Sequence, residues 1–486
     1  MNLSTLIQQV DVLDKLNFKD VDIKGISYNS NTINSHEIFV CLKGEHVDGH
    51  DFAQSAFEKG AVALMCERPL NIEIPQIIVK STQESIADLA AAFYHHPSNE
   101  LNLMGVTGTN GKTTVAHLVQ KIFEKAGKKC ALIGTLGYKL ASGDDYLEAK
   151  HTTPQAPQMQ ATLQKILKAD VLNVISEVSS HALEQFRVKN CKFQSAIFTN
   201  LTQDHLDYHI TMENYFNAKA KLFKGLKKGN NAIINNDDKY AQKLLNVIDK
   251  EVNILTYGVK NKSDIMAKNI EFMPDGVEFD CIYKDEKTHF KLHLNGMFSV
   301  YNSLAAIATA LANGIDLNTT KEALEVTKSV AGRFEIVKTN PMVIVDYAHT
   351  PDGLENILRA ARELTQKDGN LICMFGCGGN RDCTKRPKMG KIAQQLCDKI
   401  IITSDNPRSE DPQQIITDIL SGLSLINPKT VFVEPDRHLA IKLLKDISSE
   451  NDVLVLAGKG HEDYQILADK TIHFDDREEV LKVFGA

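Results

Sequence analysis

The chain has 486 residues, of which 43% are hydrophobic and 24% charged, and its formal net charge is −7. This length indicates two to four domains, and the acidity argues against a sequence-independent nucleic-acid binder, which would present a basic face. No apolar run reaches about 18 residues, so no membrane span is expected, and the N-terminus lacks the pattern of a secretory signal. The 9 dispersed cysteines form no C-x-x-C pair, which favours free thiols in a reducing cytoplasm over disulfides or a zinc site.

The first part of the chain, residues 1–97, reads as a small α/β domain. Alternating and apolar runs predict strands over residues 25–30, 38–42, 61–66 and 77–79, with a helix over residues 52–59. The polar segment Pro97-Ser98-Asn99 predicts a linker to the next domain, because proline and small polar residues interrupt regular structure.

The middle part, residues 98–330, opens with a glycine-rich segment, Gly105-Val106-Thr107-Gly108-Thr109-Asn110-Gly111-Lys112-Thr113-Thr114. It lies between an apolar run over 101–104 and a helical pattern that begins at Val115. Such a turn presents backbone N–H groups and a helix N-terminus to phosphate. The lysine adds a charge for the terminal phosphates, and the threonine hydroxyl can reach Mg²⁺. The alternative is a tight turn with an exposed lysine.

The rest of the middle part alternates strands and helices. We expect strands over residues 171–176, 195–200 and 232–235, helices over 212–223 and 302–312, and a strand-rich, antiparallel addition between about residues 252 and 294. The last part, residues 331–486, predicts strands over 343–345, 371–375, 399–403, 431–433 and 453–456, each next to a helical stretch. The fold class predicted is therefore α/β, with parallel sheets in the second and third parts.

Three residues of the middle part are chemically notable. Glu177 ends a predicted buried strand, where it could bind Mg²⁺ or be a solvated carboxylate. His205 follows the next strand and could be a metal ligand or a surface or capping histidine. Lys219 lies in a helical pattern, and from composition alone it reads as a solvated helix lysine.

The last part has four polar segments at predicted strand ends. Asp346-Tyr347-Ala348-His349 suits a nucleotide contact or a turn and helix cap. The glycine-rich run over residues 376–382 is only a weak dinucleotide signal. Arg408, in Asp405-Asn406-Pro407-Arg408, suits a bidentate carboxylate clamp, with a capped helix start as a compatible alternative. The fourth segment is Gly458-Lys459-Gly460-His461-Glu462, whose two glycines let the backbone approach a ligand and whose Glu462 carboxylate could accept a hydrogen bond from an ammonium group.

Taken together, these segments resemble the Mur ligases, the ATP-dependent amide-forming enzymes of peptidoglycan precursor synthesis. The resemblance spans nearly the whole chain and rests on Gly108–Thr114, Thr152-Thr153-Pro154, 177–181, 200–207, 218–223, Gly332-Arg333, 346–349 and 458–462, in family order. It implies three domains: residues 1–97 for the UDP-sugar, 98–330 for ATP and 331–486 for the amino acid. It also implies a cytoplasmic monomer with ATP and Mg²⁺ as cofactors.

The resemblance implies roles for individual residues. Catalytic roles fall on Lys112, Glu177, His205 and Lys219. Mg²⁺ would be held by Thr113, Glu177, His205 and Lys219. Lys219 matches the family's carbamylated lysine, which reverses its interpretation from composition as a solvated helix lysine. ATP would contact Gly108, Thr109, Asn110, Gly111, Lys112, Thr113, Thr114, Asn302, Arg333, Asp346 and His349. The UDP-substrate would contact Ser30, Thr152, Thr153, Ser179, Gln185 and Arg187, and the amino acid Arg381, Asp405, Asn406, Pro407, Arg408, Gly458 and Glu462.

Within the family, the chain is most similar to the enzymes that extend UDP-N-acetylmuramoyl-L-alanyl-D-glutamate by a diamino acid. Asp405-Asn406-Pro407-Arg408 is the form found where that amino acid is meso-diaminopimelate, whereas lysine-adding members usually lack the arginine. The alternatives are an L-lysine-adding synthetase, a ligase similar to folylpolyglutamate synthase, and a nucleotide-driven switch or motor. A motor should show an apolar run ending in a Walker-B aspartate, and none is evident.

Overall fold

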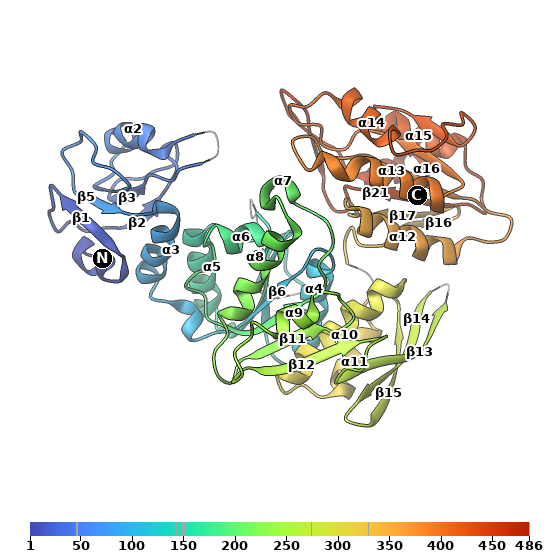
Figure 1. Ribbon diagram of the computed structural model, residues 1–486, viewed down its shortest axis with the longest axis horizontal. Coiled ribbons are helices and arrows are strands. Elements are labelled where there is room, and N and C mark those ends of the chain that lie inside the picture. The colour runs from blue at the N-terminus through green and yellow to red at the C-terminus, as the bar shows by residue number, and fades with distance from the viewer. Residues whose placement is uncertain (45–46, 142, 148–150, 274, 329, 486) are drawn as a thin grey trace.

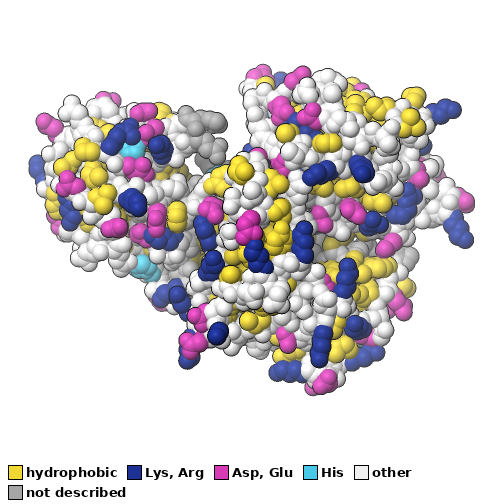
Figure 2. Space-filling model, in the orientation of Figure 1, with side chains coloured by type: hydrophobic (Ala, Val, Ile, Leu, Met, Phe, Trp, Pro, Cys, Tyr) yellow, Lys and Arg dark blue, Asp and Glu magenta, His cyan; other side chains and the backbone are white. Residues whose placement is uncertain are grey.

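The computed structural model describes residues 1–44, 47–141, 143–147, 151–273, 275–328 and 330–485. The chain forms three α/β lobes, each built around its own sheet, and the lobes follow one another in chain order (Figure 1). On the face shown in Figure 2, acidic and basic side chains are interspersed over all three lobes. No described helix is long and apolar enough to cross a membrane. All nine cysteines are free thiols.

The first lobe is a five-stranded sheet in the order β1-β5-β4-β3-β2, with only β1 antiparallel to its neighbour. Its elements are α1 (Leu3–Leu6), β1 (Val12–Leu16), β2 (Gly25–Ser27), β3 (Glu37–Val40), α2 (Ala53–Glu58), β4 (Ala63–Cys66), β5 (Gln76–Val79) and α3 (Thr82–Phe93). The sequence predicts all of these strands except β1. That edge strand is mostly solvent-exposed, so it lacks the apolar alternation that marks a half-buried strand.

The junction after the first lobe packs against the second lobe. Residues Pro97–Asn99 form a 3₁₀ helix in which Pro97 and Ser98 are buried, and the Ser98 hydroxyl donates to the Asn190 carbonyl oxygen at 3.4 Å. Lys189 also bridges Glu84 and Asp88 of α3, at 2.8 and 3.1 Å. The segment predicted as a linker is thus a docked turn, and it fixes the first lobe on the second.

The second lobe contains a ten-stranded sheet in the order β15-β14-β13-β12-β11-β10-β6-β9-β7-β8. Its strands are β6 (Asn102–Thr107), β7 (Cys130–Gly134), β8 (Gly137–Lys139), β9 (Asn173–Glu177), β10 (Phe193–Phe198), β11 (Asn231–Asn235), β12 (Asn253–Gly258), β13 (Ile265–Met273), β14 (Gly276–Tyr283) and β15 (Glu286–Leu292). The pairs that join β7, β9, β6, β10, β11, β12 and β13 are parallel, whereas β8 is antiparallel to β7. The expected antiparallel addition is formed by β13, β14 and β15, and β12, which falls within its predicted range, pairs in parallel instead.

Helices cover both faces of this sheet. One apolar core lies under α4 (Lys112–Lys125), α10 (Met297–Ala312) and α11 (Leu317–Glu325). The other lies under α5 (Ala156–Lys168), α6 (Ser180–Glu184), α8 (Met212–Lys224) and α9 (Ala241–Leu245). Since both faces are buried, the central strands read as continuous apolar runs, which explains why the sequence locates them.

The third lobe has a six-stranded sheet in the order β16-β17-β21-β18-β19-β20, parallel except for the edge strand β16. Its elements are β16 (Glu335–Thr339), β17 (Met342–Asp346), α12 (Pro351–Leu364), β18 (Leu371–Phe375), α13 (Arg386–Leu396), β19 (Lys399–Ile402), α14 (Pro412–Leu420), β20 (Val431–Val433), α15 (Arg437–Asp446), β21 (Val453–Ala457), β22 (Tyr464–Ile466), β23 (Thr471–His473) and α16 (Asp476–Phe484). The five predicted strands are present, while β16 and the β22–β23 pair are not anticipated.

Candidate active site

The glycine-rich segment forms a tight loop between β6 and α4. The helix begins at Lys112, three residues before the predicted start, with Gly111 in the left-handed region at φ 88° as its N-cap. A Cβ at Gly111 would lie 2.4 Å from Asn302 Oδ1, and one at Gly108 would lie 1.9 Å from Thr199 Oγ1. Only glycine fits at both positions, so the tight turn that leads into the N-terminus of α4, the kind of element that binds phosphate, depends on these two glycines.

Hydrogen bonds to the next strand end hold this loop in place. Thr109 Oγ1 donates to the Thr202 carbonyl oxygen at 3.1 Å, and the Asn110 amide donates to Asn200 Oδ1 at 2.9 Å. The Lys112 ammonium folds back onto the Gly108 and Thr109 carbonyl oxygens, at 3.0 and 2.9 Å. Burial lowers the pKa of Lys112, with the nearby Glu177 opposing that shift. The lysine is therefore part of the loop, contrary to the alternative of an exposed turn lysine.

Thr113 and Glu177 meet beside the loop. Glu177 is 0% exposed, and its carboxylate accepts hydrogen bonds from Thr113 Oγ1 at 3.0 Å and from the amide and hydroxyl of Thr135 at 3.0 and 3.1 Å. This burial excludes the reading of Glu177 as a solvated strand-end carboxylate. A hydroxyl and a carboxylate next to a phosphate-binding helix are hard oxygen donors, which suit Mg²⁺ completed by water and phosphate.

Arg333, from the segment before β16, reaches the same corner. Its Nη2 donates to Thr113 Oγ1 at 3.0 Å, across 220 residues of sequence. Its guanidinium carbon lies 4.6 Å from the centre of the Tyr347 ring, and its buried Nε has no hydrogen-bond partner within the described part of the chain. An unpartnered guanidinium N–H beside a phosphate loop fits an anionic ligand.

Lys219 lies on α8 with its side chain only 3% exposed. Its ammonium donates to the Gly108 carbonyl oxygen at 2.8 Å and lies 4.6 Å from the centre of the Tyr215 ring. Burial, with a smaller contribution from Lys112, holds its pKa well below the usual value. The prediction of a solvated helix lysine, made from composition alone, is therefore wrong: α8 packs this face against the phosphate loop.

His205 is the N-cap residue of the short helix α7 (Leu206–His209), with φ 54°. Its Nε2 lies 3.2 Å from Asp204 Oδ2, and burial lowers its pKa to about 3. Asp204 is buried and also faces His349 Nε2 and Lys385 Nζ of the third lobe, each at 3.7 Å. His205 thus occupies the N-cap position without a capping hydrogen bond from its side chain, and it lies beside Asp204, which contacts the third lobe.

Asp346 and Asp352 of the third lobe lie near the glycine-rich loop. The Asp346 carboxylate accepts from the backbone amides of Phe334 and Ala348, both at 2.7 Å, so it shapes the turn that presents His349. Asn110 Nδ2 donates to Asp352 Oδ2 on α12 at 2.7 Å. The reading as a turn and helix cap is confirmed, because Thr350 caps α12 by accepting from the Gly353 amide, and the nucleotide contact stays a prediction.

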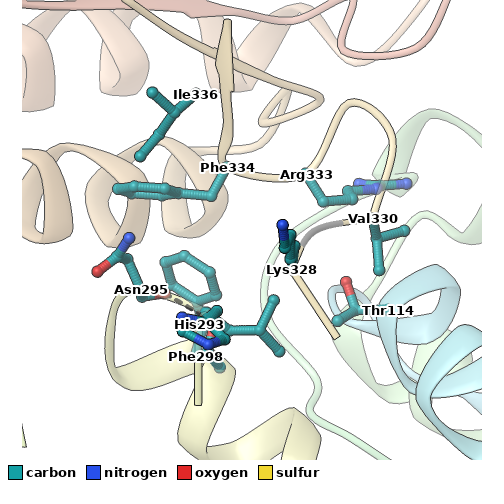
Figure 3. A pocket seen from close by; sticks show the side chains of 11 residues that line it. Thr114, His293, Asn295, Phe298, Lys328, Val330, Arg333, Phe334 and Ile336 are labelled. Carbon is teal, nitrogen blue, oxygen red and sulfur yellow. Dashed lines mark hydrogen bonds between the residues drawn. The ribbon is translucent and has the colours of Figure 1, made fainter. Parts of the chain in front are cut away.

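A cavity of about 200 Å³ adjoins the loop between α10 and the connection to the third lobe. Figure 3 shows Thr114 on one side of it and the Phe298 and Phe334 rings on another, with Lys328 and Arg333 among the other lining residues. The two ring centres are 5.8 Å apart. Aromatic walls next to a phosphate loop suit a nucleotide base.

A second cavity, of about 800 Å³, lies between the first two lobes. Ser30 and Gln185 line it from opposite lobes, together with Tyr28, Gln155 and Tyr208. Its size and mixed lining suit a large polar ligand rather than a small metabolite.

A hydrogen-bonded relay connects the neighbourhood of this cavity to Glu177. Thr153 Oγ1 donates to the Glu177 carbonyl oxygen at 2.9 Å and receives the Ser179 amide at 3.0 Å. Arg187 donates to the Thr153 carbonyl oxygen at 3.0 Å and to Gln185 Oε1 at 2.7 Å. Thr152 Oγ1 accepts from the Thr135 hydroxyl at 3.2 Å. All six residues predicted for the UDP-substrate thus lie in this cavity or in the relay.

Arg408 is held at the carboxyl edge of the third sheet. Its backbone has φ 55°, and its Nη1 donates to the carbonyl oxygens of Gly379 and Asn406, at 3.0 and 3.3 Å. Within the described residues, its Nε and Nη2 donate to no protein acceptor, so one edge of the fork remains for a carboxylate. Asp411 separately caps α14, so the prediction of a capped helix start is confirmed.

The other predicted amino-acid residues surround this arginine. Asn406 Nδ2 donates to Glu462 Oε2 at 2.8 Å, and the Gly458 amide donates to the Asp346 carbonyl oxygen at 3.0 Å. The exposed Arg381 donates to the Asn380 carbonyl oxygen at 3.1 Å, and the Pro407 carbonyl oxygen accepts from the Glu410 amide at 3.1 Å. Burial and the like charge of Asp405 raise the pKa of Glu462.

Two charged residues at these sites were missed as individual candidates. Lys385 faces Asp204, and Lys459 lies between Asp405 and Glu462. The position of Lys459 inside Gly458-Lys459-Gly460-His461-Glu462 was a signal that could have identified it. No group of three or more His, Cys, Asp or Glu side chains among the described residues could hold a metal alone, so ligand oxygens would have to complete any Mg²⁺ site.

Family models match all three lobes: the Mur ligase family catalytic domain over residues 22–97, the Mur ligase middle domain over 106–310, and the Mur ligase glutamate ligase domain over 332–460. The chain is 45% identical over 489 residues to a UDP-N-acetylmuramoyl-L-alanyl-D-glutamate–2,6-diaminopimelate ligase of Clostridium botulinum, covering 98% of each chain. A relative of the same name from Aquifex aeolicus is 44% identical, over 95% of this chain and 94% of the relative.

A solved structure of a UDP-N-acetylmuramoyl-L-alanyl-D-glutamate–2,6-diaminopimelate ligase is similar to the chain with a TM-score of 0.66 and 31% identity, covering 95% of this chain and 94% of that one. A folylpolyglutamate synthase of Mycobacterium tuberculosis has a TM-score of 0.63 at 15% identity, over 82% of this chain and 94% of that one, and so shares only the fold. The chain belongs to the Mur ligase family of ATP-dependent, amide-forming ligases.

Proposed function

We propose that this protein joins meso-2,6-diaminopimelate to UDP-N-acetylmuramoyl-L-alanyl-D-glutamate at the expense of ATP, in peptidoglycan precursor synthesis. The observation that carries this proposal is the free Nε–Nη2 edge of Arg408, close to the carboxylates of Asp405 and Glu462. The guanidinium of Arg408 is complementary to a carboxylate, and the carboxylates of Asp405 and Glu462 are complementary to an ammonium group. Together they match an amino acid whose distal end has both groups.

We assign one ligand to each lobe. Residues 1–97, with Ser30, would bind the UDP-sugar at the cavity shared with Gln185. Residues 98–330 would bind ATP through the loop at Gly108–Thr114, with its base in the smaller cavity near Thr114. Residues 331–486 would bind the amino acid. All of these groups belong to one chain, so we take the monomer as the catalytic unit, working in the cytoplasm where ATP and UDP-linked precursors are found.

The reaction would proceed in two steps. The D-glutamyl side-chain carboxylate attacks the γ-phosphorus of ATP, giving an acyl phosphate and ADP. The amine of the amino acid then attacks the acyl carbon, and loss of phosphate leaves the amide bond. Lys112, Arg333 and the loop amides would neutralise charge on the phosphoryl oxygens as they transfer. Mg²⁺, held by Thr113, Glu177 and His205, would add electrostatic stabilisation of the same oxygens.

Lys219 would contribute to the metal site as a carbamate. Its neutral amine attacks CO₂, the new N–C bond forms, and a proton is released, which replaces a cation by an anion. Burial of this side chain against the Gly108 carbonyl oxygen supports the proposal, because it lowers the pKa of the amine and so favours the neutral form that attacks CO₂.

Closure between the second and third lobes would bring the amine to the acyl phosphate. The contacts of Arg333 with Thr113, and of Asp204 with His349 and Lys385, support such an arrangement. Gly332 connects the two lobes in the left-handed region at φ 65°, and we place the hinge there.

The test is amino-acid-dependent phosphate release with ATP and UDP-N-acetylmuramoyl-L-alanyl-D-glutamate. We expect release with meso-diaminopimelate and far less with L-lysine. Equal rates with both amino acids would contradict the diaminopimelate assignment. Phosphate release that needs neither substrate would point instead to a nucleotide-driven switch.

A further inference from the structure

Lys459 is a buried lysine beside the amino-acid pocket. It follows β21, and its side chain is 0% exposed. Its Nζ lies 3.4 Å from Glu462 Oε2 and 3.8 Å from Asp405 Oδ1, and it donates to the Tyr464 carbonyl oxygen. Lysine is almost never fully buried without such partners, so its charge is compensated by these two carboxylates.

The two carboxylates differ in how they are satisfied. Glu462 Oε2 accepts from Asn406 Nδ2 at 2.8 Å and from Lys459. Asp405 Oδ1 is buried and has no hydrogen-bond partner in the part of the chain that the structure describes. Two carboxylates and one ammonium give this trio a net charge of one negative, with one carboxylate oxygen still lacking a donor.

Other charged and titratable groups surround the trio. Arg408 and Arg381 lie on the pocket side, Tyr464 and Tyr347 flank Glu462, and the Arg437–Asp476 pair lies behind. Arg437 is already neutralised by Asp476 at 2.6 Å, with both side chains 0% exposed. Among the described residues, Lys459 is therefore the cation that pairs with both carboxylates, at 3.4 and 3.8 Å, while Arg408 keeps its free edge for a ligand.

We propose that Lys459 is a positioning residue that sets the Asp405–Glu462 pair at one net negative charge, so that the pocket accepts a single ammonium group. Together with Arg408, this charge balance selects an amino acid whose distal end is zwitterionic. The inference rests on the proposed function, because it assumes that this pocket binds the amino acid.

Loss of Lys459 would change the protonation of the Asp405 and Glu462 carboxylates. Two adjacent carboxylates without a cation between them cannot both remain ionised, so one takes up a proton. The pKa of Glu462 is already raised by burial and by Asp405, and Lys459 opposes that rise. A proton held there competes with the substrate ammonium, so binding of the amino acid should weaken as the pH falls.

The first experiment is Lys459→Met, with kcat and KM for meso-diaminopimelate measured from acidic to alkaline pH. We expect KM to rise about tenfold or more, kcat to change less, and the acidic limb of kcat/KM to move up by about one pH unit. Lys399→Met is the matched control, since this lysine of the same lobe donates to the Ile447 carbonyl oxygen at 2.7 Å and lies outside the Asp405–Glu462 cluster. It should leave the pH profile unchanged. A wild-type KM and pH profile in Lys459→Met would overturn the inference.

The second experiment restores the charge. Lys459→Met with Glu462→Gln again leaves one net negative charge, so its kcat/KM should exceed the value expected if the two single effects multiplied. Strict multiplication would overturn charge balance as the cause. If Lys459→Met does not fold, the thermal unfolding midpoint of the double variant is measured instead. A folded double variant, with a midpoint closer to that of the wild type, supports charge balance. A double variant that is as unstable as Lys459→Met refutes it. A wild-type enzyme that uses no diamino acid would instead refute the proposed function.

Discussion

Replacing Arg408 by methionine tests the amino-acid pocket most directly. Its Nη1 is occupied by the Gly379 and Asn406 carbonyl oxygens, which leaves the Nε and Nη2 edge for a bidentate carboxylate contact. Each hydrogen bond to a charged group contributes about 1.5–3 kcal/mol. Since the side chain is only half-buried, solvent reduces the sum, and we expect a loss of about 2–4 kcal/mol, or about 30- to 700-fold in kcat/KM for meso-diaminopimelate.

The assay compares phosphate release with meso-diaminopimelate and with L-lysine. Arg408→Met should lower the preference for diaminopimelate over L-lysine, because only diaminopimelate has a distal carboxylate whose contact with Arg408 is removed. Arg408→Lys keeps the charge but not the planar fork, so its effect should be intermediate. Arg359→Met on the exposed face of α12, where Arg359 pairs with Glu355 at 2.7 Å, is the control. An unchanged preference in Arg408→Met would refute the reasoning.

Four further outcomes are expected. Lys219→Ala should abolish turnover while the protein stays folded, and added short carboxylates should restore part of it; a fully active variant refutes the role. Ile210 is 71% exposed at φ 65°, ψ −45°, so Ile210→Gly should raise the free energy of unfolding by about 1 kcal/mol, and a lower value in denaturant titration contradicts this. Arg437→Met should destabilise the fold by about 3–5 kcal/mol by leaving Asp476 buried and unpaired, and adding Asp476→Asn should recover part of that loss. Hydrogen bonds to Asp280, led by that of Lys287, lower the pKa of its carboxyl group to about 2. The ionised carboxylate therefore contributes its full stabilisation above about pH 4, and this stabilisation is lost as the pH falls toward 2. In Asp280→Asn, this part of the pH dependence of the unfolding free energy should be absent.

The sequence alone was sufficient for most of the architecture. The central strands of the second and third sheets are buried on both faces, so each is a short apolar run that can be recognised locally. The carboxyl ends of β9 and β10 place Glu177 and His205 at one edge of the second sheet, and the carboxyl end of β17 places Asp346 at the corresponding edge of the third sheet, as parallel topology requires. The loop at Gly108–Thr114 was also readable, because its glycines are demanded by the backbone geometry of the turn itself.

Edge strands and buried charges depended on tertiary structure. β1 and β16 have polar or half-exposed side chains, so their strand character comes from pairing with distant partners and leaves no local pattern. Lys219 lies among charged neighbours on an amphipathic helix, and only the packing of α8 against the Gly108 carbonyl oxygen makes it a buried residue.

The same reason applies to the contacts between lobes. Arg333 meets Thr113 across 220 residues, and Lys459 acquires its role from Asp405, which lies on a different loop. The sequence by itself therefore determined the three sheets, the phosphate loop and the family. Tertiary structure decided which lysines are buried and which charges compensate one another, because those properties arise from neighbours that are distant along the chain.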